Sequence, residues 1–432
     1  MDTRSTLADE VRAEARDWFE RQWDPARPLG EWWEMLARSG WGFPSWPQAW
    51  FGRGLPPDLA VVVNEERARA GATGLPETLG TKAIAPLLVS RGDDLQRQRY
   101  LLPTISGQAI WCELFSEPGA GSDLASLATR AGRDGDEWVI NGQKVWSSGA
   151  PVSRWGLLVA RTDPDVPKQR GLSCFVVDMH SAGVETRPLR TMTGEYKFSE
   201  VFLDDVRVPA TDVVGEIGRG WDVVKDTLAL ERKVIGPASG TGGMVDNNRI
   251  PALDRPAGDV AAEERAGRQR GAMVTGAGGM ALVRTLLECF GGADDPVTRQ
   301  QVAGLYCLQE VVRYTALRTR ASQRRREQPG FGPGPAASIM KLLTGRSAIA
   351  LRQVALRIEG PRGMLFAADA PLGGVVQKLT LASPSMAIMA GTDEIQKNII
   401  AERVLGLPPE PSSGRDVPWR QLHAGRPTGG PR

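Results

Sequence analysis

The stretch LFSEPGAGSDLAS, which runs from Leu114 to Ser126, combines serine hydroxyls, carboxylates, a proline and two glycines. Gly119 and Gly121 let the backbone approach a ligand and present its N–H groups, and Ser116 and Ser122 add hydroxyl donors. The stretch is not a dinucleotide-binding fingerprint, because no strand–loop–helix unit with a distal acid follows, and it lacks the Gly-Lys-Ser/Thr of a P-loop. A plain turn between strands explains the same composition, so both interpretations stay open at this point.

A second stretch, GQKVWSSGA, places Trp146 beside Ser147 and Ser148 at the end of a predicted strand. A tryptophan in a strand is more often part of a core than a contact to a ligand. A third stretch, LALER, ends in Glu231 and Arg232 on a predicted helix. Charged residues on a helix usually face solvent, but the apolar neighbours of Glu231 make a buried carboxylate a competing interpretation.

Three successive parts must position these groups, and their order predicts an α+β fold. Apolar residues at helical spacing dominate the first part, alternating patterns with turn signals dominate the second, and long helical patterns return in the third. The expected parts are an N-terminal helical domain over 1–110, a central β domain over 111–215, a C-terminal helical bundle domain over 216–408 and a disordered tail over 409–432. Asn141-Gly142 predicts a hairpin turn, and part of 236–280 is expected to be a flexible insertion.

Composition narrows the class of protein. The chain has 432 residues and a formal net charge of +2, so its overall charge gives no reason to expect nucleic acid or membrane as a partner. Only two histidines and four scattered cysteines are present, which disfavours a Ser-His-Asp triad, a metal site and a disulfide framework. The basic run from Arg318 to Arg326 is typical of a solvated helix end. No apolar run reaches the length of a membrane span, so the expected location is the cytoplasm.

The two motif stretches together resemble the acyl-CoA dehydrogenase family of flavoproteins. The resemblance continues through TGEYKFSEVFLDDVRVPATDVVGEIGRGW and IMAGTDEIQKNIIAERVLGLP, and it spans roughly residues 30 to 408. The resemblance implies FAD as cofactor. It also implies that the central β domain is barrel-like and that the C-terminal helices form a four-helix bundle. Because several separate motifs agree in order, the resemblance is specific for the family.

The resemblance also implies roles for individual residues. Phe115, Ser116, Trp146, Ser147 and Ser148 would lie around the flavin ring, with Ser148 near N5, the hydride acceptor. Ser122 would face the CoA-linked substrate, and Gly391, Thr392 and Glu394 would meet the phosphate-bearing side chain of the flavin. Arg357 and Gly360, in ALRIEGPRG, match the segment that meets the FAD of a neighbouring subunit, although Arg357 and Pro361 replace a family Gln and Gly.

The resemblance also suggests the position of the catalytic base, because this chain lacks a carboxylate where many family members carry it. Many family members carry it immediately before the Gly-Thr of the C-terminal motif, where this chain has Ala390. A subset that resembles the isovaleryl and long-chain enzymes instead uses a Glu in an LxLER context, which here is Glu231. Arg232 would orient that base or the substrate, and the backbone N–H of Ala390 would still donate to the thioester oxygen.

Three functional hypotheses follow. The first is α,β-desaturation of an acyl-CoA thioester to the trans-2-enoyl-CoA, with electrons passed to an electron-transferring flavoprotein. The second keeps the fold but makes oxygen the oxidant, as in an acyl-CoA oxidase or flavin monooxygenase. The third is a non-catalytic partner subunit of a hetero-oligomeric dehydrogenase. A homo- or hetero-oligomer, dimer or tetramer, is expected, and the acyl group is expected to be bulky.

Overall fold

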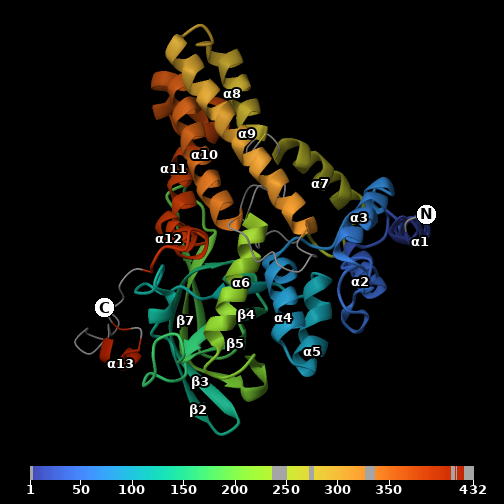
Figure 1. Cartoon of the computed structure of the whole chain (residues 1–432), viewed down its shortest axis with the longest axis vertical. Coiled ribbons are helices and arrows are strands. Elements are labelled where there is room, and N and C mark those ends of the chain that lie inside the picture. The colour runs from blue at the N-terminus through green and yellow to red at the C-terminus, as the bar shows by residue number, and fades with distance from the viewer. Residues whose placement is uncertain are drawn as a thin grey trace.

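The computed structural model describes residues 3–235, 251–271, 277–325, 336–409, 414 and 416–422. Helices come first, a β-sheet domain follows, and a helical bundle completes the chain (Figure 1). The predicted α+β fold class is confirmed. None of the helices in these described ranges is both long enough and apolar enough to cross a lipid bilayer.

The N-terminal helices surround a tryptophan-rich core. Trp32 and Trp33 are buried on one face of the second helix, and their indole N–H groups donate to the carbonyls of Thr73 and Gly74 at 3.0 and 2.8 Å. Burial of these rings therefore leaves no indole donor unsatisfied. The helices are α1 (Thr3–Gln22), α2 (Leu29–Ser39), α3 (Ala60–Arg69), α4 (Ala85–Arg91) and α5 (Asp94–Ile105).

A distant segment completes this N-terminal core. Helix α7 (Ala257–Gly271) contributes Ala257 and Val260 to the cluster that contains Trp32. The segment before it pairs with the start of α2, where the Gly30 N–H donates to the Leu253 carbonyl at 2.8 Å. Sequence patterns predict a flexible insertion within 236–280. Within that span, α7 and the segment before it instead pack on the N-terminal helices through Leu253, Ala257 and Val260, and residues 236–250 and 272–276 lie outside the described part.

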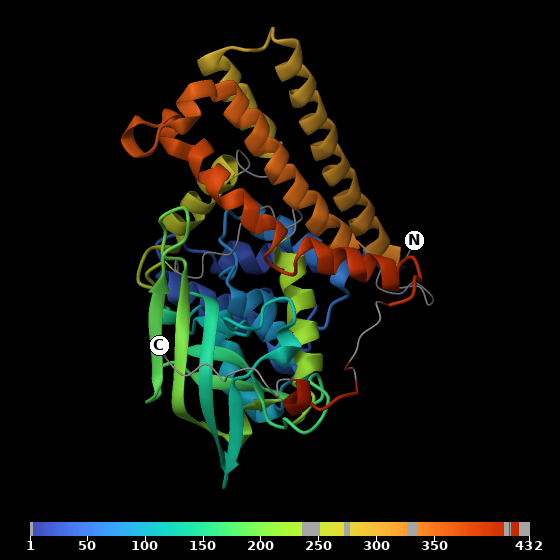
Figure 2. The same cartoon turned by 90° about the vertical axis from the view of Figure 1, so that its left-hand side faces the viewer.

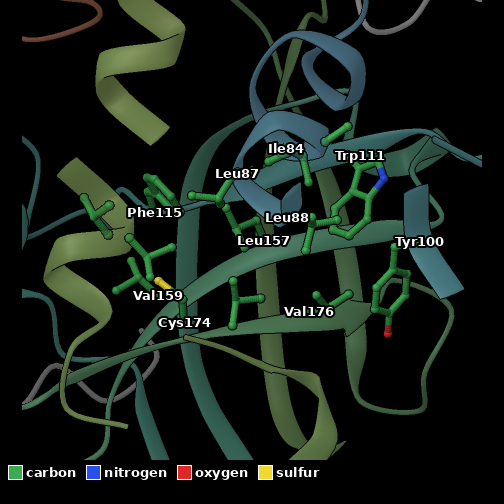
Figure 3. Packing of buried hydrophobic residues seen from close by; sticks show 14 of the residues in the cluster. Ile84, Leu87, Leu88, Tyr100, Trp111, Phe115, Leu157, Val159, Cys174 and Val176 are labelled. Atoms are coloured by element: carbon green, nitrogen blue, oxygen red, sulfur yellow. The ribbon is translucent and has the colours of Figure 1, made fainter. Parts of the chain in front are cut away.

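The central domain is one eight-stranded sheet in the order β6-β7-β3-β2-β4-β5-β8, with β1 pairing in parallel with β4. Successive residues of β4 face opposite sides of the sheet. Leu157 and Val159 meet the helices (Figure 3), while Leu158 and Ala160 belong to a second cluster on the other face. The strands are β1 (Trp111–Leu114), β2 (Arg130–Asp134), β3 (Glu137–Ser148), β4 (Trp155–Arg161), β5 (Leu172–Asp178), β6 (Val184–Leu189), β7 (Phe198–Pro209) and β8 (Val213–Val214).

The predicted hairpin at Asn141-Gly142 is wrong, because β3 continues through both residues and pairs with β7. The register shifts between Ile140 and Gly142, which marks a β-bulge. A Cβ at Gly142 would lie 2.3 Å from the hydroxyl oxygen of Thr129, the residue before β2, so the close approach of that residue to β3 requires glycine here. The hairpin turn lies instead at Gly135, between β2 and β3.

The last part is a bundle of helices above the sheet, in which the long α9 and α10 run side by side (Figure 2). Its core contains Leu286, Leu351, Ala355 and Val376. The bundle helices are α8 (Ala277–Phe290), α9 (Pro296–Arg325), α10 (Ala336–Glu359), α11 (Val375–Ala382) and α12 (Asp393–Arg403). Two further helices of this part pack elsewhere, α6 (Gly220–Ile235) and the short α13 (Trp419–Leu422).

The segment predicted to be a disordered tail is folded in part. Helix α13 and the residues before it return to the β domain, where the Trp419 N–H donates to the Val166 carbonyl at 3.0 Å. His423 and the remaining C-terminal residues lie outside the described part.

Candidate active site

A buried ion pair joins the two motif stretches. The Lys144 ammonium, in β3, donates to the Glu117 carboxylate at 2.8 Å and to the Phe115 carbonyl at 3.1 Å. The backbone N–H groups of Ala128 and Thr129 donate to the same carboxylate at 2.7 and 2.9 Å. Glu117, the carboxylate of the first motif, therefore serves to anchor its loop.

Burial disfavours the charged form of both Glu117 and Lys144, and the charge of each residue opposes this effect on the other. Burial alone would raise the pKa of Glu117, but the nearby Lys144 charge and the donated hydrogen bonds outweigh it and hold the pKa below its usual value. Burial also lowers the pKa of Lys144, against the opposing effect of Glu117. The pair is thus internally compensated and adds no net charge to the site above it.

A backbone hydrogen bond joins the two stretches that carry the predicted ring-side residues. The Val145 N–H donates to the Ser116 carbonyl at 2.9 Å, which sets the first loop directly beside the end of β3. Trp146 and Ser148 follow within three residues, and Ser148 pairs with Phe198 of β7. The two stretches are far apart in sequence but are therefore adjacent in the fold.

Trp146 is strained and exposed. It has a φ of 64°, its side chain is 60% exposed, and it contacts Phe198 edge to face. The β3–β7 register shifts between Lys144 and Ser147, so the positive φ belongs to a bulge. The interpretation of Trp146 as a core residue is wrong. Strained backbone that keeps a large apolar ring in solvent is typical of a binding site.

The side chains of Ser147 and Ser122 differ in their exposure to solvent. Ser147 is buried, and among the described residues its hydroxyl has no hydrogen-bond partner. Ser122 is exposed, between Gly121 and Asp123. Neither Gly119 nor Gly121 would bring a Cβ within 4 Å of another atom, so the loop faces open space on this side.

Phe115 connects the motif surface to α6. It is buried in the same cluster that Leu228 and Leu230 of the LALER stretch pack against (Figure 3). Glu231 and Arg232 follow on α6, and their side chains lie outside the described part. Helix α6 approaches the sheet closely, since a Cβ at Gly220 would lie 2.6 Å from the Ser173 Cα. The predicted base position is thus one turn beyond residues that share a core with the motif loop.

The loop before α12 has its own supports. Ala390 and Gly391 have φ values of 54° and 89°, and the Thr392 hydroxyl accepts from the Ile395 N–H as the helix cap. Asp393 is held by Lys341 of α10, with Nζ and Oδ1 2.6 Å apart. Glu394 is exposed, and Lys397 lies 3.8 Å from it.

Arg357 and Gly360 lie elsewhere. The Arg357 guanidinium donates to the Thr298 hydroxyl at 3.1 Å and to Asp295 at 3.2 Å, at the start of α9. Sixteen residues of α10 separate Arg357 from Lys341, or about 24 Å at 1.5 Å per residue. The structure therefore does not bring this segment to the Ala390–Glu394 loop of the same chain.

The ring-side donor set fits an isoalloxazine. That ring system presents carbonyl oxygens and ring nitrogens that accept hydrogen bonds, and the Ser116 and Ser148 hydroxyls can donate to them. The exposed Trp146 offers an apolar face, and the Lys144–Glu117 pair leaves no uncompensated charge beneath. The start of α12 fits a phosphate less completely, because its first turn carries two acids, of which Lys341 compensates Asp393.

Family models identify the class. The models of the N-terminal, middle and C-terminal domains of acyl-CoA dehydrogenases match residues 2–108, 112–206 and 287–405. The chain therefore belongs to the acyl-CoA dehydrogenase family, whose members are FAD-dependent oxidoreductases.

Three individual proteins are similar to this chain over most of its length. Acyl-CoA dehydrogenase IpdE1 of Mycobacterium tuberculosis is 37% identical over 381 residues, covering 88% of each chain. FadE34 of the same species is 34% identical over 86% of this chain, but the chain spans only 45% of that protein. The solved structure described as the Tcur3481-Tcur3483 steroid ACAD has 26% identity and a TM-score of 0.66, with 94% of this chain and 98% of the other covered.

Sequence reasoning missed three supporting residues: Lys144, Glu117 and Lys341. Lys144 and Glu117 lie inside the two motif stretches, but nothing in the local sequence shows that they pair, because 27 residues separate them. Lys341 likewise carries no local signal, since its partner Asp393 is 52 residues away in sequence.

Proposed function

We propose that this chain oxidises an acyl-CoA thioester to its trans-2-enoyl-CoA. The observation that carries the proposal is the junction at Ser116, where the Val145 N–H joins both motif stretches beside the core shared with α6. Family membership supports the same conclusion, because acyl-CoA dehydrogenation is the general activity of the relatives.

Bound FAD would supply the hydride acceptor. The residues of the chain then have three tasks. Glu231 removes the proton from the carbon α to the thioester, the Ala390 N–H donates to the thioester oxygen, and Ser116, Trp146 and Ser148 hold the ring. Ser147 lies between these ring contacts, and Ser122 and Arg232 face the substrate.

Helix geometry supports Glu231 as the base. Val224 and Thr227 of α6 are fully buried, and position 231 follows them by seven and four residues. Residues at this spacing share a helix face. The backbone of position 231 therefore lies on the side of α6 that carries these two buried residues, which supports its assignment as the base.

The substrate proposal rests on the named relatives. The Tcur3481-Tcur3483 structure is described as a steroid ACAD, which supports a bulky, ring-bearing acyl group for this chain. The paired name of that structure also supports an oligomeric assembly. In such an assembly Arg357 and Gly360 of one subunit would approach the FAD of the next, with Gly391, Thr392 and Glu394 on the phosphate side. Electrons would pass to an electron-transferring flavoprotein.

Anaerobic titration tests the function. The purified protein should be yellow, and a ring-bearing acyl-CoA should bleach the visible flavin absorbance and yield a product two hydrogens lighter by mass spectrometry. Rapid peroxide release in air without an acceptor would favour the oxidase hypothesis. A colourless protein that neither takes up FAD nor turns over would instead favour the non-catalytic subunit.

A further inference from the structure

The C-terminal segment Asp416–Leu422 forms a clasp on the β domain. The backbone N–H groups of Trp419 and Arg420 donate to the carbonyls of Val166 and Pro164 at 3.0 and 2.9 Å. Pro418 forms a β-bridge with Pro167. Helix α13, the last part of the clasp, is the short red helix beside the lower half of the sheet, apart from α12 (Figure 2). A chain segment that has left the bundle therefore binds the β domain through main-chain hydrogen bonds.

Beneath the clasp lies a buried arginine. Arg161 is 3% exposed, and its guanidinium donates to the carbonyls of Ala125, Leu127 and Lys168 at 2.7, 3.2 and 3.1 Å. Burial lowers the pKa of Arg161 to about 10, against the opposing charges of Glu117 and Asp163. A buried cation that is bound mainly by neutral carbonyls depends on every remaining contact.

Trp419 makes a further contact to Arg161, through its ring. Its ring lies over the Arg161 guanidinium, with 4.4 Å between the guanidinium carbon and the ring centroid. Its indole N–H donates to the Ser126 carbonyl at 3.3 Å. Trp419 thus covers the arginine and binds the loop that the arginine binds, and a cation–π contact is strongest when desolvated in this way.

The anchored loop is the one that carries Ser122. Its near end is fixed by Glu117 and Lys144, and its far end by Arg161 at Ala125 and Leu127. Between these two anchors Gly119 and Gly121 meet no atom that could set the loop on its outer side. Lys168, whose carbonyl Arg161 binds, adds a third support, because its Nζ lies 2.7 Å from both carboxylate oxygens of Asp123. The position of Ser122 therefore depends on the Glu117–Lys144 pair and on the contacts around Arg161 and Lys168.

We infer that Trp419 is a positioning residue of the acyl-CoA site, which acts through Arg161 to hold the Gly119–Ser126 loop for substrate binding. The inference rests on the proposed function, because it assigns Ser122 to the substrate side. The inference adds to the acyl-CoA site a segment that follows Leu407 in the chain. This segment acts on the Gly119–Ser126 loop and not on the flavin ring.

Steady-state kinetics with an artificial electron acceptor test this. Trp419→Ala should raise KM for the acyl-CoA about tenfold, with kcat within about twofold and the flavin absorbance unchanged. Trp419→Phe keeps the ring over Arg161 and should give an intermediate KM. The matched control is Arg420→Ala, whose side chain pairs with exposed Asp165 and should leave both constants unchanged.

A chain ending at Leu407 provides a second measurement. Hydrogen exchange at residues 121–127 should accelerate in it and in Trp419→Ala, while exchange at 137–148 stays unchanged. An unchanged KM with unchanged exchange overturns the inference, and so does a parallel loss of kcat and flavin, which would mean a general structural role. If the wild type binds no acyl-CoA, the proposed function fails first, and accelerated exchange at 121–127 would still support the anchoring role.

Discussion

Lys144 and Glu117 form an ion pair that is almost fully shielded from water, with side chains 0% and 8% exposed and 2.8 Å between Nζ and Oε1. The pair lies under the junction of the two motif stretches and connects β3 to the loop after β1. The position of the ring-side residues thus depends on two charged residues that need not touch the ligand.

Lys144→Met should destabilise the protein by about 3–5 kcal/mol, because it leaves the Glu117 carboxylate buried without its cation. Urea unfolding measures the change. The double variant Lys144→Met with Glu117→Gln should be less destabilised than the sum of the two single variants. Strictly additive losses would show that the two side chains do not interact.

Glu231→Gln should lower kcat by about 10²–10⁴-fold, since the amide cannot accept the substrate proton, and should keep the flavin. Stopped-flow reduction of the flavin by acyl-CoA reports this step directly. Lys225→Ala, on the exposed face of the same helix, is the matched control and should retain full activity. Full turnover in the Glu231→Gln protein would remove the base assignment.

Trp146→Gly should leave the stability of the flavin-free protein unchanged or slightly higher. Glycine accepts the φ of 64°, which costs a non-glycine residue about 1–3 kcal/mol at strained positions. The same variant should release flavin more readily, as measured by fluorescence of the filtrate. Trp138→Ala, which removes a buried ring, should instead cost about 3–5 kcal/mol.

Asp295→Asn should destabilise the bundle at neutral pH and progressively less in acid. Hydrogen bonds from the Thr298 side chain and N–H, and from Arg357, lower the pKa of Asp295 from 3.8 to about 2. A carboxyl whose folded-state pKa is lowered stabilises the fold above its unfolded pKa and loses that contribution as the pH falls through the folded value. The difference from the wild type, measured by urea unfolding, should therefore shrink between pH 3.8 and about pH 2. A constant difference across this range would contradict the role of the charge.

Local sequence patterns predicted the order of helices and strands, because apolar periodicity reports which face of an element is buried. They did not predict that Asn141-Gly142 lies within a strand. A tight turn and a close strand approach both require glycine, and only the position of Thr129 distinguishes them. Trp146 and Ala390, two of the predicted contacts, are also two of the five non-glycine residues with positive φ in the described part. Motif resemblance selected these positions, whereas the strain itself depends on neighbours that no local pattern contains.

The anchors of the site depend on pairs that are far apart in sequence. Arg161 and Trp419 are separated by more than half the chain, and the composition of the C-terminal segment indicated disorder because it is rich in Pro and Gly. A short segment can nevertheless be ordered when one aromatic ring and a few main-chain groups find partners. The identity of those partners is a property of the tertiary fold.

The docking of α7 on the N-terminal helices has a consequence for biosynthesis. The tryptophan core around Trp32 is closed only when Ala257 and Val260 arrive, more than 220 residues later. At about 5–20 residues per second, a ribosome needs roughly 10–45 s to deliver them. During that interval an incomplete apolar surface is present on the nascent chain, which makes the first domain to be translated one of the last to finish folding and a natural client for chaperones.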